Sequence, residues 1–361
     1  MATSLSSRTV IRGVQGSSHS TNAKRWALRL RSCKDRSPGF RVSVRKVNIL
    51  SVELGESLDV AGFRHRGTSI RDELGSHAIG AGAYEAYAGQ PIWPYHYHHG
   101  VEEWLYVMSG APVLRDPAGQ RTLQPGDVVA FPSGYVGAHT VAGPGRFMIV
   151  STGDHVEPWM SVYPDSDKVG GPGGMLLRSS AVSYWHGEGT DPPVEQVAAK
   201  REPPPTAARQ PIVNVHSFPV VRPRPDAPAG FRARGARIAP ALQTSRLGAQ
   251  VVELDPGEGS APYHYEYGRE EWVLVLTGTP TLRHPEGLDS LEPGDVVCFP
   301  AGPRGAHRLT NDVDGIARVV FLSTMERPSN VHYPDDGKWL LRNAEDDLIM
   351  LRDGPPVSYW E

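Results

Sequence analysis

The sequence contains one long internal repeat, and this repeat limits what the chain can fold into. Residues 94–110, PYHYHHGVEEWLYVMSG, return at residues 262–278 as PYHYEYGREEWVLVLTG. Around them, residues 89–139 align without a gap with residues 257–307 at an offset of 168, and 28 of the 51 aligned positions are identical. Solenoid repeats are about 20 to 50 residues long, so a repeat of this size indicates two copies of one folding unit.

The length of the chain agrees with two units. Its 361 residues suit two domains of about 150 residues with extensions, and each is long enough to bury its own core. The alignment reaches back to GFRHRG at Gly62 and GFRARG at Gly230. We predict four segments: a basic disordered leader at 1–46, an N-terminal domain at 47–190, a Pro-rich linker at 191–211 and a C-terminal domain at 212–361.

Both units end in similar tails. Val182-Ser183-Tyr184-Trp185 closes the first unit and Val357-Ser358-Tyr359-Trp360 closes the second, each after a Tyr-Pro-Asp that starts at Tyr163 or Tyr333. We interpret the tails as clasps that pack on the domain or on its sister.

Composition narrows the function classes. The net charge is -3, which provides no field of the kind that binds nucleic acid. The two cysteines, Cys33 and Cys298, rule out a disulfide framework and favour a reducing compartment. No apolar run approaches the roughly 20 residues of a membrane helix. We therefore expect a soluble, cytoplasmic protein without membrane or nucleic-acid partners.

The leader differs from the rest of the chain. Residues 1–46 hold eleven Lys or Arg and one acid, Asp35, and are rich in Ser. This composition is typical of an organelle transit peptide. A wrongly chosen upstream start codon explains the same composition, and both interpretations stay open.

The strand pattern predicts an all-β protein. Short runs such as EWLYVMSG, GDVVAFP and RFMIVST alternate with turns, and 39 Gly and 33 Pro leave few places for long helices. The loops QPGD at 124–127 and EPGD at 292–295 place Pro and Gly where a tight turn precedes a buried strand. Strands at about ten-residue spacing suggest a sandwich or a barrel.

The repeated segment also carries metal-binding side chains. His96 and His98 are two residues apart, so a strand places both on one face, and Glu103 opens the next strand. A carboxylate on an otherwise apolar face is costly unless it is paired or bound to a metal. With His139 from a later loop, the set of nitrogen and oxygen donors suits Fe, Mn, Ni, Cu, Co or Zn.

These motifs resemble those of the cupin superfamily, and their double occurrence resembles a bicupin. The first motif corresponds to Gly89, His96, His98, Glu103 and Gly110, and the second to Gly126, Pro132, Gly134 and His139. The matching residues of the second unit are Gly257, His264, Glu271, Gly278, Gly294, Pro300, Gly302, His307 and Asn311. The resemblance implies two tandem jelly-roll β-barrels, each a double-stranded β-helix with a divalent transition metal in its mouth.

The two predicted sites differ at one ligand. The first comprises His96, His98, Glu103 and His139, whereas the second comprises His264, Glu266, Glu271 and His307. Glu266 replaces an imidazole by a carboxylate, which cancels the charge of a divalent ion, favours a harder metal and weakens its Lewis acidity. The second site therefore either binds metal or only keeps the shape of the first.

Several neighbours have simpler explanations. We expect His99 to be solvated. Glu102 and Glu270 repeat beside the ligands, and we expect both to face solvent, with a second role in supporting the ligands or moving protons left open. Arg115 and Arg283 suit rim ion pairs better than binding of a substrate carboxylate.

The resemblance implies fold more strongly than function, since cupins include dioxygenases, oxalate decarboxylases, isomerases, storage proteins and regulatory binders. Our main hypothesis is a metal-dependent oxidoreductase, dioxygenase- or decarboxylase-like, acting on a small organic acid or phenol. The alternatives are a non-catalytic bicupin that binds a metal or small ligand, and a sugar isomerase or epimerase. Beyond the ligands no catalytic residue is assigned, and homo-oligomerisation is left open.

Overall fold

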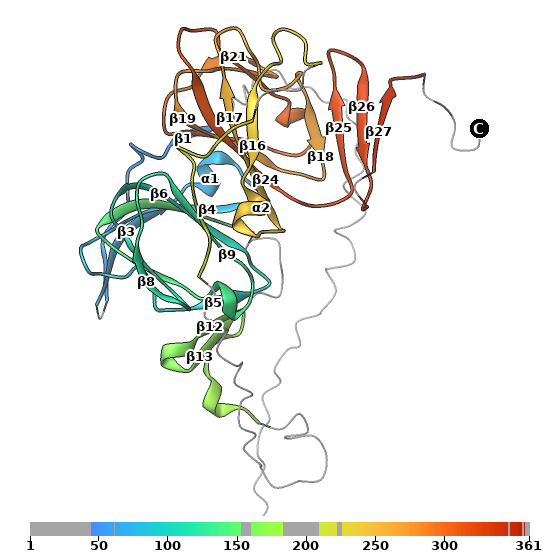
Figure 1. Ribbon diagram of the computed structural model, residues 1–361. Helices are drawn as coiled ribbons and strands as arrows, with labels where there is room; N and C mark the ends of the chain where they lie inside the picture. The colour runs from blue at the N-terminus through green and yellow to red at the C-terminus, as the bar shows by residue number, and fades with distance from the viewer. Residues whose placement is uncertain are drawn as a thin grey trace, which may run out of the picture. The chain divides into compact units, whose positions relative to one another are not determined.

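The computed structural model describes residues 45–60, 62–152, 160–182, 209–221, 226–345, 347–355 and 357 (Figure 1). The leader up to residue 44, most of the linker and most of both tails lie outside these residues, so the predictions for them stay untested. All described residues belong to one compact unit, residues 43–361. Within the described residues, no helix is long and apolar enough to cross a membrane.

The first domain consists of antiparallel sheets. Its large sheet has the order β9-β6-β11-β4-β3-β2 and contains β2 (Leu58–Val60), β3 (Phe63–Ser69), β4 (Gly80–Ala86), β6 (Glu103–Gly110), β9 (Asp127–Phe131) and β11 (Gly145–Ser151). The opposing sheet, in the order β10-β7-β8, contains β7 (Val113–Asp116), β8 (Gly119–Thr122) and β10 (Thr140–Ala142). A third sheet, in the order β14-β13-β12-β5, contains β5 (Tyr97–His99), β12 (Met160–Tyr163), β13 (Lys168–Gly171) and β14 (Gly174–Leu177).

The second domain repeats this plan. Its large sheet, in the order β22-β19-β24-β17-β16, contains β16 (Arg234–Arg237), β17 (Leu247–Leu254), β19 (Glu271–Thr277), β22 (Asp295–Phe299) and β24 (Ala317–Thr324). One smaller sheet, in the order β21-β20-β23, contains β20 (Thr281–His284), β21 (Gly287–Ser290) and β23 (Arg308–Thr310). The other, in the order β18-β25-β26-β27, contains β18 (Tyr265–Tyr267), β25 (Ser329–Tyr333), β26 (Lys338–Arg342) and β27 (Leu348–Arg352). The described helices are α1 (Arg71–Leu74), α2 (Ala239–Leu242) and the 3-10 turns η1 (Tyr135–Gly137), η2 (Pro164–Ser166), η3 (Arg178–Ser180) and η4 (Pro303–Gly305). The prediction of two tandem jelly rolls in an all-β chain is confirmed.

The predicted turns before the buried strands are also present. Gly126 and Gly294 have φ values of 89° and 90°, a region that favours glycine. In the first of these turns the Asp127 carboxylate accepts a hydrogen bond from the backbone N–H of Gln124 at 2.8 Å. The second turn has the equivalent bond from Glu292 to Asp295, at 3.0 Å.

The two domains exchange short strands. β1 (Lys46–Asn48), which precedes the first domain, pairs with β22 of the second, and β15 (Ile212–Asn214), which precedes the second domain, pairs with β9 of the first. In each case an Asn side-chain amide donates to an Asp carboxylate at 3.0 Å, Asn48 to Asp295 and Asn214 to Asp127. The predicted first residues of the two domains, 47 and 212, remain a prediction. The pairing shows that β1 and β15 each join the large sheet of the other domain.

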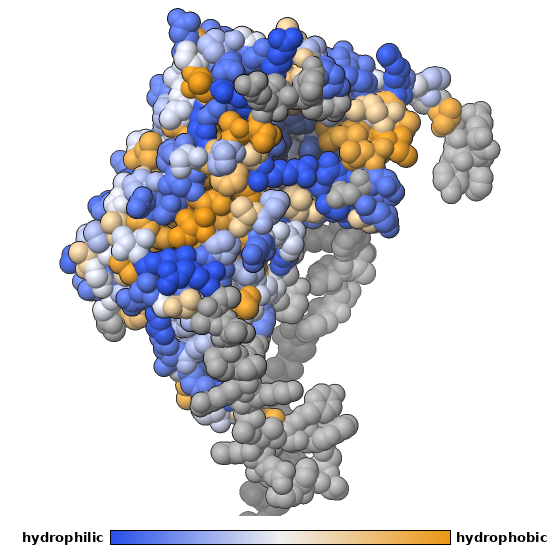
Figure 2. Space-filling view, in the orientation of Figure 1, coloured by the Kyte–Doolittle hydropathy of each residue, from blue (hydrophilic) through white to orange (hydrophobic). Residues whose placement is uncertain are grey.

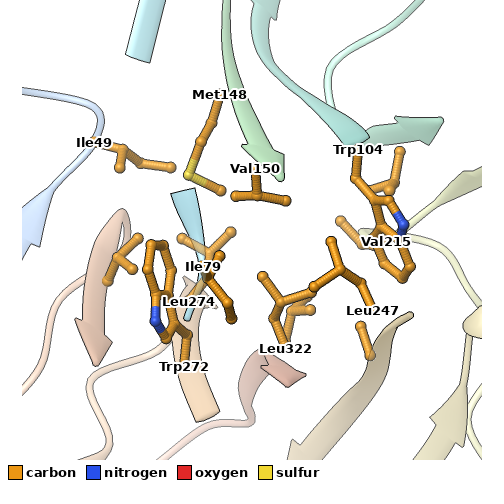
Figure 3. Close-up of a cluster of buried hydrophobic side chains, with 14 of the residues drawn as sticks. Ile49, Ile79, Trp104, Met148, Val150, Val215, Leu247, Trp272, Leu274 and Leu322 are labelled. Atoms are coloured by element: carbon orange, nitrogen blue, oxygen red, sulfur yellow. The ribbon is translucent and has the colours of Figure 1, made fainter. Parts of the chain in front are cut away.

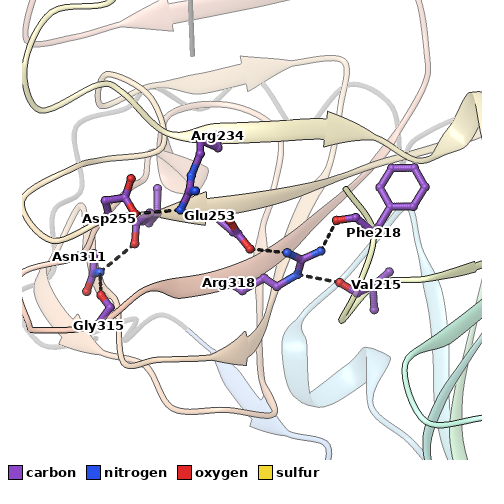
Figure 4. A network of polar contacts seen from close by, with 9 residues as sticks. Val215, Phe218, Arg234, Glu253, Asp255, Asn311, Gly315 and Arg318 are labelled. Carbon is purple, nitrogen blue, oxygen red and sulfur yellow. Dashed lines mark hydrogen bonds and ion pairs between the residues drawn. The ribbon is translucent and has the colours of Figure 1, made fainter. Parts of the chain in front are cut away.

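After each crossing, the chain is fastened back to its own domain by an arginine. Arg318 in β24 donates to the backbone oxygen of Val215 at 2.8 Å and also contacts the backbone oxygen of Phe218 and the Glu253 carboxylate (Figure 4). Arg146 in β11 donates in the same way to the oxygen of Val52, at 2.8 Å. The exchange is therefore reciprocal.

The faces of the large sheets form separate cores. In β6, Leu105 and Val107 point into the first domain, whereas Trp104 points into a cluster that contains buried side chains of both domains. Trp272 is the counterpart of Trp104, and Figure 3 shows both indoles in this shared cluster. Side chains of this cluster, with a few neighbours, line an apolar pocket of about 50 Å³. Alternation along β6 thus assigns one face to its own core and the other to the interface between domains.

Glu102 and Glu270 do not face solvent, so our expectation for them was wrong. Their exposed fractions are 2% and 3%. The Glu270 carboxylate accepts hydrogen bonds from the first domain, namely from the Ser76 hydroxyl and the backbone N–H groups of His77, Ala78 and Ile79. The Glu102 carboxylate accepts from the second domain, namely from the backbone N–H groups of Ser245, Arg246 and Leu247. Each carboxylate also accepts from the indole N–H of Trp104 or Trp272 in its own domain.

Each third sheet ends in an exposed apolar edge strand. Met175, Leu176 and Leu177 are exposed in β14, as are the four apolar residues at 348–351 in β27. Figure 2 shows hydrophobic side chains gathered beside β26 and β27. An exposed apolar edge can pair with another chain, which keeps homo-oligomerisation as a prediction.

Candidate metal centres

The first site is assembled by a bridge between two loops. His96 and His139 form an antiparallel bridge in which each backbone N–H donates to the other residue's oxygen, at 3.0 and 2.8 Å. His98 lies in β5, and Glu103 begins β6. The structure therefore brings together all four residues that the sequence predicts for this site.

The orientation of the three imidazoles is fixed by bonds at Nδ1. His96 Nδ1 is 2.8 Å from the backbone oxygen of Pro94, and His139 Nδ1 is 2.9 Å from that of Gly137. A carbonyl oxygen only accepts, so both Nδ1 atoms carry the proton and both Nε2 atoms keep a free lone pair. His98 Nδ1 is 2.9 Å from the hydroxyl of Ser161, which is buried.

The free ring nitrogens converge on one carboxylate. Glu103 Oε2 is 3.0 Å from His98 Nε2 and 3.6 Å from His139 Nε2. Ligand atoms of His96, His98 and Glu103 all lie within 4.8 Å of one another; His139 is not in that group, and its assignment as a fourth ligand stays a prediction. Phe131 stacks on His139 with ring centroids 3.6 Å apart, and Tyr163 stacks on His96 at 5.8 Å. Three nitrogens and one carboxylate, walled by aromatic rings, suit a divalent transition metal.

Charge at this site also suits a cation. Burial raises the pKa of Glu103, but the imidazoles of His98, His139 and His96 outweigh it and hold this pKa at about 2. Burial, with His96 adding to it, lowers the pKa of His139 to about 3. For His98, burial lowers the pKa, but contact with Glu103 outweighs this effect and raises it. At neutral pH the site therefore presents an ionised carboxylate and at least one neutral imidazole.

The second site repeats three of the four positions. His264 and His307 form the same bridge, their Nδ1 atoms lie 2.9 Å from the backbone oxygens of Pro262 and Gly305, and His307 Nε2 is 3.2 Å from Glu271 Oε2. Ligand atoms of His264, Glu271 and His307 lie within 4.8 Å of one another. Glu266 is not in that group; its Oε2 is 3.9 Å from Arg269 Nε. The assignment of Glu266 as a ligand stays a prediction.

The replacement of His98 by Glu266 is accompanied by a second replacement. Ser161 pairs with His98 across β12 and β5, and at the equivalent place across β25 and β18 Val331 pairs with Glu266. The hydroxyl that supports the imidazole is therefore missing where the imidazole is missing. Burial, with Glu271 adding to it, raises the pKa of Glu266 to about 7, and burial with His307 lowers that of His264 to about 4.

A family model now accounts for both copies. The model described as the cupin domain matches residues 84–152 and again residues 250–323. This chain is a bicupin.

Solved structures similar to the bicupin include two isomerases and a decarboxylase. A putative sugar phosphate isomerase from Acidithiobacillus ferrooxidans is 26% identical, with 36% of this chain and 83% of that chain covered and a TM-score of 0.34. A cupin-superfamily sugar phosphate isomerase from Silicibacter pomeroyi is 25% identical, with 41% and 98% covered and a TM-score of 0.35. Oxalate decarboxylase from Bacillus subtilis is 14% identical, with 79% and 77% covered and a TM-score of 0.45. No curated protein matches the chain.

The sequence analysis missed one part of both sites of the bicupin. Asp165 and Asp335, from the repeated Tyr-Pro-Asp, accept hydrogen bonds from Nη2 of Arg115 and Arg283, at 3.0 and 2.9 Å. The predicted ion pairs of these arginines are thereby confirmed. The tyrosine of the same motif lies against the first histidine of each site, Tyr163 at 5.8 Å and Tyr333 at 5.9 Å between ring centroids. The repetition of Tyr-Pro-Asp was the signal that would have revealed this wall.

The mouths of the two domains of the bicupin differ more than the ligand sets do. A pocket of about 320 Å³ reaches Glu103, and its polar lining includes Arg71, Asp72 and Tyr84. A pocket of about 250 Å³ reaches Glu266 and Glu271. Its lining includes four arginines: Arg237, Arg269, Arg327 and Arg342.

Proposed function

We propose that the bicupin is a metal-dependent enzyme whose chemistry, dioxygenase- or decarboxylase-like, is carried out at the first site on a small organic acid or phenol. The observation that carries this proposal is the convergence of His98 Nε2 and His139 Nε2 on Glu103 Oε2, with a ligand atom of His96 within 4.8 Å of those of His98 and Glu103. Four protein ligands leave one or two coordination positions of a transition metal for a substrate.

His96, His98, Glu103 and His139 would hold the ion, which when bound supplies Lewis-acid or redox chemistry to a substrate oxygen. The aromatic walls of Phe131 and Tyr163 exclude water from the imidazoles.

Tyr84 lines the same pocket and carries a phenol hydroxyl that can donate a hydrogen bond. Burial, with the nearby Glu103 carboxylate, raises the pKa of Tyr84 to about 12, so the phenol keeps its proton at neutral pH. Its hydroxyl can therefore donate a hydrogen bond to an anionic substrate oxygen. Arg71 at the same mouth provides a positive charge for the acid group of a substrate.

One observation favours the non-catalytic alternative. Glu102 and Glu270 are the carboxylates that repeat beside the ligands, and both are buried and bonded to the other domain's backbone N–H groups. They are therefore not available to move protons for a reaction. A bicupin that binds a metal and a small ligand without turnover is the second candidate function.

Metal analysis and substrate assays separate the two candidates. Purified wild-type protein and His96→Ala should be compared for bound Fe, Mn, Ni, Cu, Co and Zn, and for oxygen uptake and CO₂ release with organic acids and phenols. The proposal expects metal and turnover in the wild type, both lost in the variant at the first site. Bound metal without turnover on any compound would favour the binding function, and unchanged metal in His96→Ala would refute the ligand assignment.

A further inference from the structure

The pocket of the second domain collects positive charge from four separate elements. Arg237 ends β16, Arg269 precedes β19, Arg327 precedes β25 and Arg342 ends β26, and all four line the same pocket. Guanidinium groups stay protonated in proteins. The lining of this pocket thus contains four guanidinium groups and two carboxylates, those of Glu266 and Glu271.

Arg269 is the most constrained of the four. Its exposed fraction is 8%, and its Nε donates to the backbone oxygen of Glu326 at 3.1 Å. Its Nη2 is buried and, in the part of the chain that the structure describes, has no hydrogen-bond partner. A buried polar group without a partner is rare in proteins and unfavourable, so this N–H points to a ligand that accepts its hydrogen bond.

The guanidinium groups also act on one another. Arg269, Arg327 and Arg342 line the same pocket, so their positive charges repel one another. Positive groups that repel one another at this range are stabilised when an oxyanion lies between them. Guanidinium groups match carboxylate and phosphate oxygens with two parallel N–H bonds.

The described residues of the first domain lack this arrangement. Arg237 pairs with Gln250 across β16 and β17, and the equivalent pair across β3 and β4 is Ser69 with Gly82. At the offset of 168, Val101 stands in the place of Arg269. The lining of the first pocket has one guanidinium, that of Arg71, next to the carboxylate of Asp72. An anion of higher charge therefore fits the second mouth and not the first.

We propose that the arginine pocket of the second domain binds a small molecule with two negative charges on oxygen, a dicarboxylate or a phosphate ester, whose oxygens accept hydrogen bonds from Arg269 Nη2 and the neighbouring guanidinium groups. A pocket of about 250 Å³ is smaller than the usual range for drug-sized ligands, so the ligand is a small metabolite. The proposal concerns binding alone and stands whether or not the first site is catalytic.

Calorimetric titration of the full chain tests this proposal. Malonate and inorganic phosphate are the two dianionic probes, and acetate is the monoanionic control. Each is titrated into the protein as purified and after treatment with a chelator. We expect malonate or phosphate to bind at least about tenfold more tightly than acetate, with an affinity that falls as salt rises. Malonate alone would identify a dicarboxylate site, and phosphate alone a phosphate-ester site.

Matched variants locate the binding. Arg269→Gln should weaken it by about tenfold or more and the exposed Arg237→Gln by about threefold, because each removes a charge-assisted hydrogen bond. Arg304→Gln removes the same charge from an exposed position in η4, outside the pocket lining, and should leave the affinity unchanged. If Arg269→Gln does not fold, the affinities of Arg237→Gln and Arg342→Gln show whether the anion binds in this pocket.

Three results would overturn the proposal. The first is that neither dianion binds. The second is that the arginine variants bind as tightly as the wild type. The third is that binding disappears with the chelator but survives Arg237→Gln and Arg342→Gln. The last result would mean that the anion coordinates a metal. None of these results bears on metal content or turnover at the first site, which His96→Ala tests separately.

Discussion

The two candidate metal sites of the bicupin share a backbone frame but differ in the groups that surround it. In both, a bridge joins two histidines whose Nδ1 atoms bond backbone oxygens, and a glutamate opens the neighbouring strand. The differences are concentrated around one position: His98 with Ser161 in the first domain, and Glu266 with Val331 and Arg269 in the second. These replacements fit one another, as our proposal of a different ligand for the second site requires.

By contrast, the contacts between the domains are nearly symmetric. Glu102 and Glu270 each accept hydrogen bonds from the loop that follows the short helix of the other domain. The comparison therefore separates a symmetric interface, which holds the molecule together, from two sites that have diverged. The following predictions test this separation, beginning with the largest expected effect.

The symmetric interface should respond equally to damage on either side. Glu102→Ala and Glu270→Ala each leave several buried N–H groups without an acceptor, so each should lower the free energy of unfolding by about 4 kcal/mol. Urea denaturation of both variants, with the exposed Glu73→Ala as a control, measures the effect. A difference of more than about 2 kcal/mol between them would contradict the symmetry.

The ligand position that differs should matter more in the first site. His98→Ala removes one of the four predicted ligands of the first site. It should weaken metal binding there by about 100-fold, a loss of about 2.7 kcal/mol of binding free energy. Glu266→Gln should weaken binding at the second site by about tenfold, because His264, Glu271 and His307 remain close together. Competition titrations with a metal indicator give both affinities, and equal losses would remove the distinction between the sites.

The hydroxyl that supports His98 should have a measurable effect on metal binding. Ser161→Ala removes the partner of His98 Nδ1, and the loss of such an outer partner lowers metal affinity by about tenfold or more. The reverse change, Val331→Ser, is the matched control, since no imidazole is paired with that position. It should leave metal affinity at the second site unchanged; a gain there would show that the hydroxyl acts on the metal in another way.

The buried carboxylates should give the metal-free protein opposite responses to pH. The pKa of Glu266 is raised to about 7, so the stability from its protonated form is present below its unfolded pKa and is lost as pH rises through 7. The pKa of Glu103 is lowered to about 2, so its contribution is present above its unfolded pKa and is lost only as pH falls toward 2.

With a chelator present, the ionisation of Glu266 should therefore lower the free energy of unfolding of the wild type by about 1 kcal/mol as the pH rises from 6 to 8. Glu266→Gln, which cannot ionise at this position, should abolish that decrease in a series of denaturation curves. If wild type and variant show the same slope over this range, Glu266 does not titrate near neutral pH.

The sequence alone determined the architecture and most of the first site. A gapless repeat, strand alternation and Gly-Asp turns were enough to predict two all-β units of the sandwich or barrel class, because side chains alternate along a strand. The resemblance to cupins then implied the jelly-roll topology. The same alternation placed His96 and His98 on one face, and Glu103 at the start of the next strand and His139 from a later loop completed the predicted set. The structure then showed these four side chains together, with the support of Ser161, Pro94 and Gly137 added.

The tertiary structure decided everything that depends on the other domain or on distant strands. Nothing local distinguishes a glutamate that faces water from one that binds another domain's backbone, so Glu102 and Glu270 were misjudged. The exchange of β1 and β15 joins residues such as Lys46 and Val297, and no periodicity contains that pairing. The arginine pocket likewise draws its charges from positions between 237 and 342, and only folding places them around one space.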